Sequence, residues 1–234
     1  MFNKSWIPNG LTSMNLVFGV CSILCTFEGE IAWAATCILL ALVADGLDGR
    51  SARALHVSSE IGKEMDSLCD LVSFGVAPAF LAFNLQLQIF GIFGWVSAIF
   101  FALCGMWRLA RFNVSTDVVH GYFMGLAIPA GGCLIATSTL LAKCIGYDLD
   151  QLSYCYPVII MAIGYLMVST VHYPNFKGDG AEKMNLAAKI AAAVIFLAVL
   201  YVGMEAVVPA LLFAVFASYA VFGIINHAIN LAGK

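Results

Sequence analysis

Four aspartates lie close together in an otherwise apolar part of the sequence. Asp45 and Asp48 are three residues apart, and Asp66 and Asp70 are four residues apart. Either spacing places both carboxylates of a pair on one face of a helix. Carboxylate oxygens are the ligands that hard cations such as Mg²⁺ and Mn²⁺ prefer. Four carboxylates suffice for two such ions at the roughly 3.5–4 Å spacing of two-metal phosphoryl transfer. The pattern therefore predicts a site for two divalent cations.

Glycines and an arginine accompany these acids. Gly46, Gly49 and Gly62 lie beside the aspartates, where their lack of a side chain lets a ligand such as a diphosphate approach the backbone. Arg53 lies two helical turns beyond Asp45 and can bind a phosphate through two hydrogen bonds. The surroundings of the acids thus favour a phosphate-bearing ligand.

The composition is that of an integral membrane protein. Of 234 residues, 62% are hydrophobic and 11% are charged, whereas a soluble domain has about a quarter charged residues. The net charge of −3 is small, and no basic run or interleaving of basic and aromatic residues indicates a nucleic-acid partner, so we expect none. Most of the eight cysteines lie inside apolar runs, so we interpret them as small apolar side chains rather than a disulfide framework.

Charge-free intervals predict the membrane spans, because about 20 apolar residues cross a bilayer. The polar, glycine-bearing stretch at 84–94 divides one long interval into two spans. We therefore expect one all-α membrane domain over residues 1–234, with about eight transmembrane helices at 5–27, 31–53, 66–85, 93–110, 120–142, 155–173, 185–203 and 206–228.

Positive charges predict the orientation of these spans, because cytoplasmic loops are rich in lysine and arginine. With eight spans, Lys143 alone falls on the side opposite the termini. On the side of the termini lie Lys4, Arg50, Arg53, Lys63, Arg108, Arg111, Lys177, Lys183, Lys189 and Lys234. We therefore expect a protein of the cytoplasmic membrane with both termini in the cytoplasm. The second and third helices should pack antiparallel, with their acidic faces opposed at the cytoplasmic edge.

The acidic segment resembles the signature of a known family. Residues 45–70 read Asp45-Gly-Leu-Asp48-Gly49-Arg-Ser-Ala52-Arg53, then eight residues, then Gly62-Lys-Glu-Met-Asp66-Ser-Leu-Cys-Asp70. This is similar to the pattern D-x-x-D-G-x-x-A-R-x8-G-x3-D-x3-D of the CDP-alcohol phosphotransferases. Members of that family move a substituted phosphate from a CDP-linked donor to an alcohol and release CMP. They are commonly homodimers, so the resemblance also implies a homodimer.

The resemblance implies a role for each matching residue. Asp45, Asp48 and Asp66 would hold two divalent cations, Mg²⁺ or Mn²⁺, and Asp70 would contribute to one of them. Asp70 would also be the general base, because an alcohol needs a base within hydrogen-bond reach to become a good nucleophile. The CDP part of the lipid would contact Pro8, Asn9, Gly10 and Leu11 before the first span, together with Gly49, Arg53, Ser59 and Gly62.

Three further segments are similar to bacterial membrane-spanning phosphatidylserine synthases, namely 108–113, 125–130 and 173–177. This likeness implies CDP-diacylglycerol as donor and L-serine as acceptor. Arg108 and Arg111 are three residues apart on one face and, with Asn113, are candidates to bind the serine. Gly131 and Gly132 stand where the likeness leads us to expect alanines.

Two alternatives stay open. Another member of the same family would make phosphatidylglycerol phosphate or a phosphatidylinositol phosphate, but a phosphate-bearing acceptor needs a denser basic pocket than Arg108 and Arg111 supply. A cation or proton transporter would place its acids near the bilayer midplane, with access from both sides. Here no charged residues lead from the aspartates to the far face.

Overall fold

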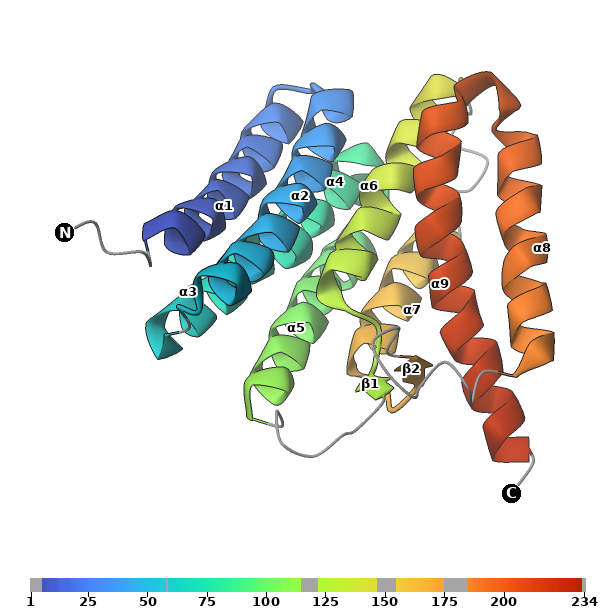
Figure 1. The fold of residues 1–234 in the computed structure, drawn as a ribbon. Coiled ribbons are helices and arrows are strands. Elements are labelled where there is room, and N and C mark those ends of the chain that lie inside the picture. Colours follow the sequence, from blue (N-terminus) through green and yellow to red (C-terminus); the bar gives the residue numbers. More distant parts are fainter. Residues whose placement is uncertain (1–5, 58, 115–121, 147–154, 175–184, 233–234) are drawn as a thin grey trace.

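A computed structural model describes residues 6–57, 59–114, 122–146, 155–174 and 185–232. Within these ranges the chain forms a bundle of helices with one small β-ladder (Figure 1). The helices are α1 (Trp6–Phe27), α2 (Ile31–Leu55), α3 (Glu60–Asp70), α4 (Ala77–Leu85), α5 (Ile92–Val114), α6 (Ile128–Cys144), α7 (Tyr156–Val168), α8 (Leu186–Val202) and α9 (Val207–Ala232). The π-helical segment η1 (Leu71–Val76) joins α3 to α4, and short 3₁₀ turns are η2 (Leu87–Phe90) and η5 (Met204–Ala206).

The predicted membrane class is confirmed. Five helical segments of the described chain are long and apolar enough to cross a bilayer: Trp6–Phe27, Ile31–Leu55, Glu60–Leu85, Ile92–Val114 and Met204–Asn230. The helices α6, α7 and α8 are apolar but shorter. The predicted break near 84–94 is also present, since α4 ends, η2 follows and Gly91 has φ +53° before α5 begins.

Helix α1 has a polar inner face and an apolar outer face. Thr12, Asn15 and Ser22 are buried against other helices, whereas Leu24 and Phe27 are exposed. A bilayer favours this distribution, because lipid tails solvate large apolar side chains while small and polar residues form the helix contacts. Helix α1 packs against α2, α3 and η1, so its buried polar face is directed toward these elements.

A close approach fixes α1 against η1. A Cβ added at Gly19 would lie 2.9 Å from the Cα of Ser73, so only glycine fits there. The Ser73 hydroxyl donates a hydrogen bond to the backbone carbonyl of Asn15 at 2.9 Å. π-Helical turns are frequent at functional sites because they re-aim the side chains around them. Here the π turn begins directly after Asp70.

Three predicted span boundaries are wrong. The third span begins at Glu60 rather than 66, because Ser59 caps the helix by accepting a hydrogen bond from the Gly62 N–H at 3.0 Å. The fifth span, predicted over 120–142, begins later, because α6 starts at Ile128. The sixth span, predicted over 155–173, ends earlier, because α7 ends at Val168. There the chain forms strands β1 (Tyr122–Met124) and β2 (His172–Pro174), which pair antiparallel.

Backbone chemistry explains where α6 begins. Gly125 has φ +76°, a conformation that interrupts a helix and that glycine adopts at little cost. Pro129 lies in the first turn of α6, where its fixed φ and missing N–H favour a helix start. The residues Lys4, Lys177, Lys183 and Lys234 of the predicted charge pattern lie outside the described residues.

We predict that Gly132→Ala destabilises the protein and that Gly131→Ala does not. A Cβ at Gly132 would lie 2.7 Å from the carbonyl oxygen of Phe74, which is backbone, whereas one at Gly131 would lie 3.2 Å from the flexible Sδ of Met167. Overpacking of this kind costs about 1–3 kcal/mol, or a few degrees of Tm for a chain of this size. Thermal unfolding of the two variants in detergent measures the difference, and equal Tm values would contradict the packing described for α6.

Candidate active site

Three carboxylates meet at one end of the bundle. Asp45 and Asp48 on α2 and Asp66 on α3 each offer an oxygen, and these atoms all lie within 4.8 Å of one another. Asp48 is buried, and the other two are partly buried. Helix α1 packs against both α2 and α3, so it holds the two acidic helices at a distance that lets their carboxylates face each other.

The donor set of this three-carboxylate cluster fits a hard divalent cation. Oδ1 of Asp66 is buried and has no hydrogen-bond partner among the described residues. A buried carboxylate oxygen without a partner is costly, and a cation among the three carboxylates would both satisfy it and offset their mutual repulsion. All-oxygen, carboxylate-rich ligand sets are those that Mg²⁺ and Mn²⁺ prefer.

Asp70 lies beside the cluster but has a partner of its own. Its Oδ1 accepts a hydrogen bond from the Nδ2 of Asn15 at 2.9 Å, and its side chain is buried. It is within electrostatic range of Asp45, Asp48 and Asp66. The structure therefore brings together three of the four predicted metal ligands and places the fourth next to them, with one oxygen bonded to α1.

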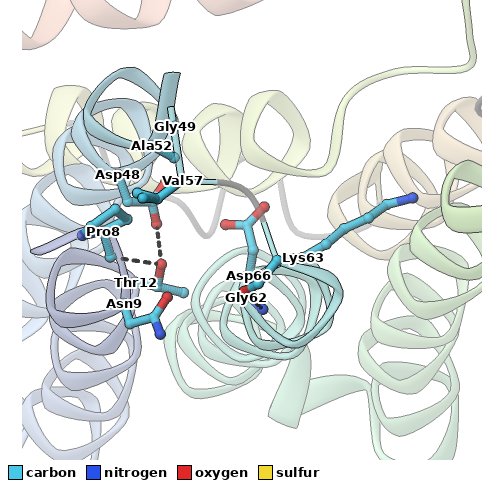
Figure 2. A pocket seen from close by; sticks show the side chains of 11 residues that line it. Pro8, Asn9, Thr12, Asp48, Gly49, Ala52, Val57, Gly62, Lys63 and Asp66 are labelled. Atoms are coloured by element: carbon cyan, nitrogen blue, oxygen red, sulfur yellow. Dashed lines mark hydrogen bonds between the residues drawn. The ribbon is translucent and has the colours of Figure 1, made fainter. Parts of the chain in front are cut away.

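Two polar side chains of α1 support these acids. The hydroxyl of Thr12 is 2.7 Å from Oδ2 of Asp48, to which it donates, and Asn15 donates to Asp70 (Figure 2 shows the first contact). Sequence reasoning missed both residues. The available signal was the recurrence of small and polar residues at helical spacing along an apolar span, which marks a buried polar face.

A pocket of about 220 Å³ opens beside the cluster. In Figure 2, Asp48 and Asp66 point toward each other across it, while the Lys63 side chain runs away from both. The lining residues are Pro8, Asn9, Thr12, Asp48, Gly49, Ala52, Val57, Ser59, Gly62, Lys63 and Asp66. Five of the residues predicted to contact the CDP part are among them, namely Pro8, Asn9, Gly49, Ser59 and Gly62.

The predicted position of the Pro8–Leu11 contact stretch is corrected. It lies inside α1, which begins at Trp6, rather than before the first span. The helical period then turns Pro8, Asn9 and Thr12 toward the pocket, while Gly10 and Leu11 are not among its lining residues and Gly10 is exposed.

Arg53 lies directly over Gly49. A Cβ added at Gly49 would be 3.5 Å from Nη1 of Arg53, so the guanidinium reaches back along α2 to the pocket wall. On the opposite wall, a Cβ at Gly62 would be 3.0 Å from Oγ of Ser59 and 3.4 Å from Oδ1 of Asn9. The two glycines thus leave the backbone accessible between a cationic group and two polar groups, which suits a phosphate.

The structure separates the three predicted serine-binding residues. Nη1 of Arg111 donates to the carbonyl of Val168 at 2.9 Å, and its Nη2 donates to that of Met124 at 3.0 Å. Nδ2 of Asn113 donates to the Ser67 hydroxyl at 2.9 Å. Arg111 and Asn113 therefore fasten the C-terminal end of α5 to α7, β1 and α3.

Arg108 differs from its neighbours. Its Nε is buried without a hydrogen-bond partner among the described residues, and its guanidinium lies 5.7 Å from the ring centre of Phe112. It is within electrostatic range of Asp70, with no hydrogen bond or ion pair between them. Its planar group of donors therefore remains available to a ligand next to Asp70.

We predict that Thr12→Val weakens the binding of divalent cations. Removing a hydrogen bond that orients a ligating carboxylate typically costs 10- to 100-fold in metal affinity. A cation that binds the folded state raises Tm, so the Mn²⁺ concentration at half-maximal Tm shift should rise by roughly that factor. Ser13→Ala is the matched control, because the Ser13 hydroxyl bonds only to the Asn9 carbonyl on the exposed side of α1. Equal midpoints for both variants would contradict the role of Thr12.

Comparison with known proteins agrees with this site. Residues 5–170 match the family model described as CDP-alcohol phosphatidyltransferase.

The chain is similar to proteins named CDP-diacylglycerol–serine O-phosphatidyltransferase. That of Helicobacter pylori strain 26695 is 36% identical over 171 residues, which cover 73% of this chain and 72% of the relative. That of Bacillus subtilis strain 168 is 35% identical over 187 residues, covering 77% and 97%. That of Methanocaldococcus jannaschii is 36% identical over 170 residues, covering 73% and 74%. The chain therefore belongs to the CDP-alcohol phosphatidyltransferase family and is a transferase of phospholipid synthesis.

Proposed function

We propose that the protein transfers the phosphatidyl group of CDP-diacylglycerol to the hydroxyl of L-serine, forming phosphatidylserine and releasing CMP. The observation that carries this proposal is the order of groups across the site. The glycine-walled pocket with Arg53 adjoins the three-carboxylate cluster, Asp70 lies one helical turn beyond Asp66, and Arg108 is within electrostatic range of Asp70. The names of the relatives support the same donor and acceptor.

The donor would bind with its diphosphate at the cluster. Arg53 would contact a phosphate oxygen over Gly49, and Pro8, Asn9 and Ser59 would border the rest of the CDP part. Two divalent cations held by Asp45, Asp48 and Asp66, with a contribution from Asp70, would neutralise the diphosphate and the charge that develops on the departing CMP. Thr12 keeps the Asp48 carboxylate oriented for that task.

Asp70 would act as the general base. The serine oxygen forms a new bond to the phosphorus of the phosphatidyl group, the bond from that phosphorus to CMP breaks, and the hydroxyl proton passes to Asp70. Asn15 holds Oδ1 of Asp70, which leaves Oδ2 to accept the proton. The amide donor thereby fixes the direction in which the base faces.

The basic residues at this end favour a small acceptor. Arg111 is bonded to backbone carbonyls, and Nζ of Lys63 lies 3.5 Å from the carbonyl of Asn113. Arg108 remains to bind the serine carboxylate, through the two parallel hydrogen bonds that a guanidinium makes with a carboxylate. A phosphate-bearing acceptor such as glycerol 3-phosphate would require more cationic groups than this part of the described chain offers beside Asp70.

The assay of purified protein with Mn²⁺ or Mg²⁺, CDP-diacylglycerol and labelled serine tests the proposal. We expect serine-dependent CMP release, reduced by about 10²–10⁴-fold in Asp70→Asn, because general-base catalysis contributes that much. Glu64→Gln on the exposed side of α3 is the matched control and should keep full activity.

Two results would count against the proposal. Release of CMP with glycerol 3-phosphate but not with serine would exclude serine as the acceptor. Full activity in Asp70→Asn would exclude this residue as the base. A cation transporter would show neither serine-dependent release nor formation of a lipid product.

We also propose that the three shorter apolar helices cross the membrane with the five longer ones, which places both termini and the site at the cytoplasmic side of the cytoplasmic membrane. Helix α7, with 13 residues, spans about 20 Å, so the bilayer must thin locally around it. Arg53, Lys63 and Arg108 lie at the end of the bundle that holds the aspartates, whereas Lys143 lies at the other end of α6.

Reporter fusions test this orientation. A fluorescent protein at the C-terminus should fluoresce, and alkaline phosphatase at the same place should be inactive, because that enzyme folds only outside the cytoplasm. Phosphatase inserted after Gly146, at the other end of α6, should be active. The reverse pattern would overturn the proposed orientation.

A further inference from the structure

A second cavity, of about 180 Å³, lies in the half of the bundle away from the aspartates. It is bounded by the middle of α6, the first two turns of α7 and of α9, and the last residue of α4. Arg111 donates to the carbonyl of Val168 at the other end of α7, so the cavity and the site lie toward opposite ends of this helix. Apart from Ser138, Thr139 and Tyr156, the cavity lining consists of leucine, isoleucine and phenylalanine side chains.

One of the three hydroxyl groups in this lining has no acceptor. The hydroxyls of Ser138 and Thr139 donate to the carbonyl of Ile135, at 2.9 and 2.8 Å. The hydroxyl of Tyr156 is buried and has no hydrogen-bond partner among the residues that the structure describes, and the whole side chain is only 7% exposed. A buried phenol hydroxyl normally has a partner, because burying it without one is costly. The wall of the cavity therefore contains a donor that requires an acceptor.

The lining defines the chemistry of a ligand that supplies this acceptor. No charged side chain lines the cavity, so nothing there would offset the desolvation of an ionic group. The ligand must therefore be apolar, with an uncharged oxygen that can accept one hydrogen bond. An apolar cavity of about 150 Å³ holds a ligand of the size of benzene, so this one has room for a stretch of roughly six chain carbons. An acyl chain with its ester carbonyl meets all of these requirements.

The length of α7 gives independent support for a lipid at this place. Its 13 residues span about 20 Å, whereas the hydrocarbon core of a bilayer is about 30 Å thick. A bilayer that thins to match α7 brings its ester groups to the level of the first residue, which is Tyr156. Helix α7 packs mainly against α5 and makes few contacts with α6. The space beside Tyr156 is therefore left open to the surrounding lipid.

We propose that this cavity binds an acyl chain of a bilayer phospholipid whose ester carbonyl accepts a hydrogen bond from the Tyr156 hydroxyl. The lipid belongs to the leaflet on the side opposite the aspartates, so it is a different molecule from the donor substrate. Its chain fills the space between α6, α7 and α9, and its ester holds the thin bilayer against the start of α7. This site goes beyond the proposed function and does not depend on the acceptor alcohol.

Two lipids that differ only in their carbonyls test the hydrogen bond. Dioleoylphosphatidylcholine has two ester groups, and the corresponding diether lipid has the same headgroup and chains without carbonyls. A lipid that binds the folded protein raises Tm. For the purified protein in detergent we expect the midpoint of the Tm shift to lie at an about fivefold lower concentration of the ester lipid, since a hydrogen bond between neutral groups is worth about that much.

Tyr156→Phe should abolish the difference between the two lipids, because it removes the hydroxyl and keeps the ring. Tyr165→Phe is the matched control. This residue lies on the same helix, but its side chain is 62% exposed and does not line the cavity, so the fivefold difference should persist. A second variant, Ser138→Leu, fills the cavity and keeps the Tyr156 hydroxyl. It should remove the saturable Tm shift with both lipids without lowering the Tm of the lipid-free protein.

Three results would overturn the proposal. Equal midpoints for the two lipids with the wild-type protein would mean that water alone satisfies the hydroxyl of Tyr156. A difference that persists in Tyr156→Phe would place the ester at another site, and an unchanged Tm shift in Ser138→Leu would exclude the cavity as the place of binding. None of these measurements involves CMP release, so the proposed function stands or fails separately.

Discussion

Mutual repulsion of four carboxylates at one end of an apolar bundle is the constraint on which the rest of the structure depends. Helix α1 meets it by carrying Thr12 and Asn15 on one face, so that a single helix donates to an acid of α2 and to an acid of α3. The close approach at Gly19 fixes that face against the π turn after Asp70. The repulsion left among the other oxygens, including the unpartnered Oδ1 of Asp66, is what a bound cation would offset.

The cationic side chains at the end of the bundle that holds the aspartates have different roles. Arg111 and Lys63 donate to backbone carbonyls and hold the end of α5 in place. Arg53 lies over Gly49 beside the donor pocket, and the buried Nε of Arg108 has no hydrogen-bond partner among the described residues. A buried guanidinium N–H without a partner is costly, so the position of Arg108 within electrostatic range of Asp70 is itself a reason to expect an anionic ligand there.

Sequence reasoning succeeded where chemistry is encoded locally. The i,i+3 and i,i+4 spacings placed the acids, and the apolar intervals gave the class of fold and the break before α5. It failed where distant segments decide the outcome. Nothing local distinguishes Arg111 from Arg108, because the carbonyls that bind Arg111 belong to β1 and α7. The start of α6 was misplaced because hydropathy continues through β1, although Gly125 and Pro129 mark the true boundary. Thr12 was missed because its importance depends on Asp48, 36 residues away.

The bundle separates the donor pocket and the acids from the residue that we propose to bind the acceptor. Helices α1 to α3 supply the donor pocket and the acids, and all of them fall within the matched stretch. Arg108 lies on α5, outside the lining of the donor pocket and within electrostatic range of Asp70. Since Arg108 is not one of the carboxylates and lines no part of the donor pocket, the residues around it can change without disturbing metal or CDP binding. A change of acceptor around Arg108 would therefore leave the acids and their α1 donors untouched, which makes this end of α5 the place where substrate choice can vary at least cost to the chemistry.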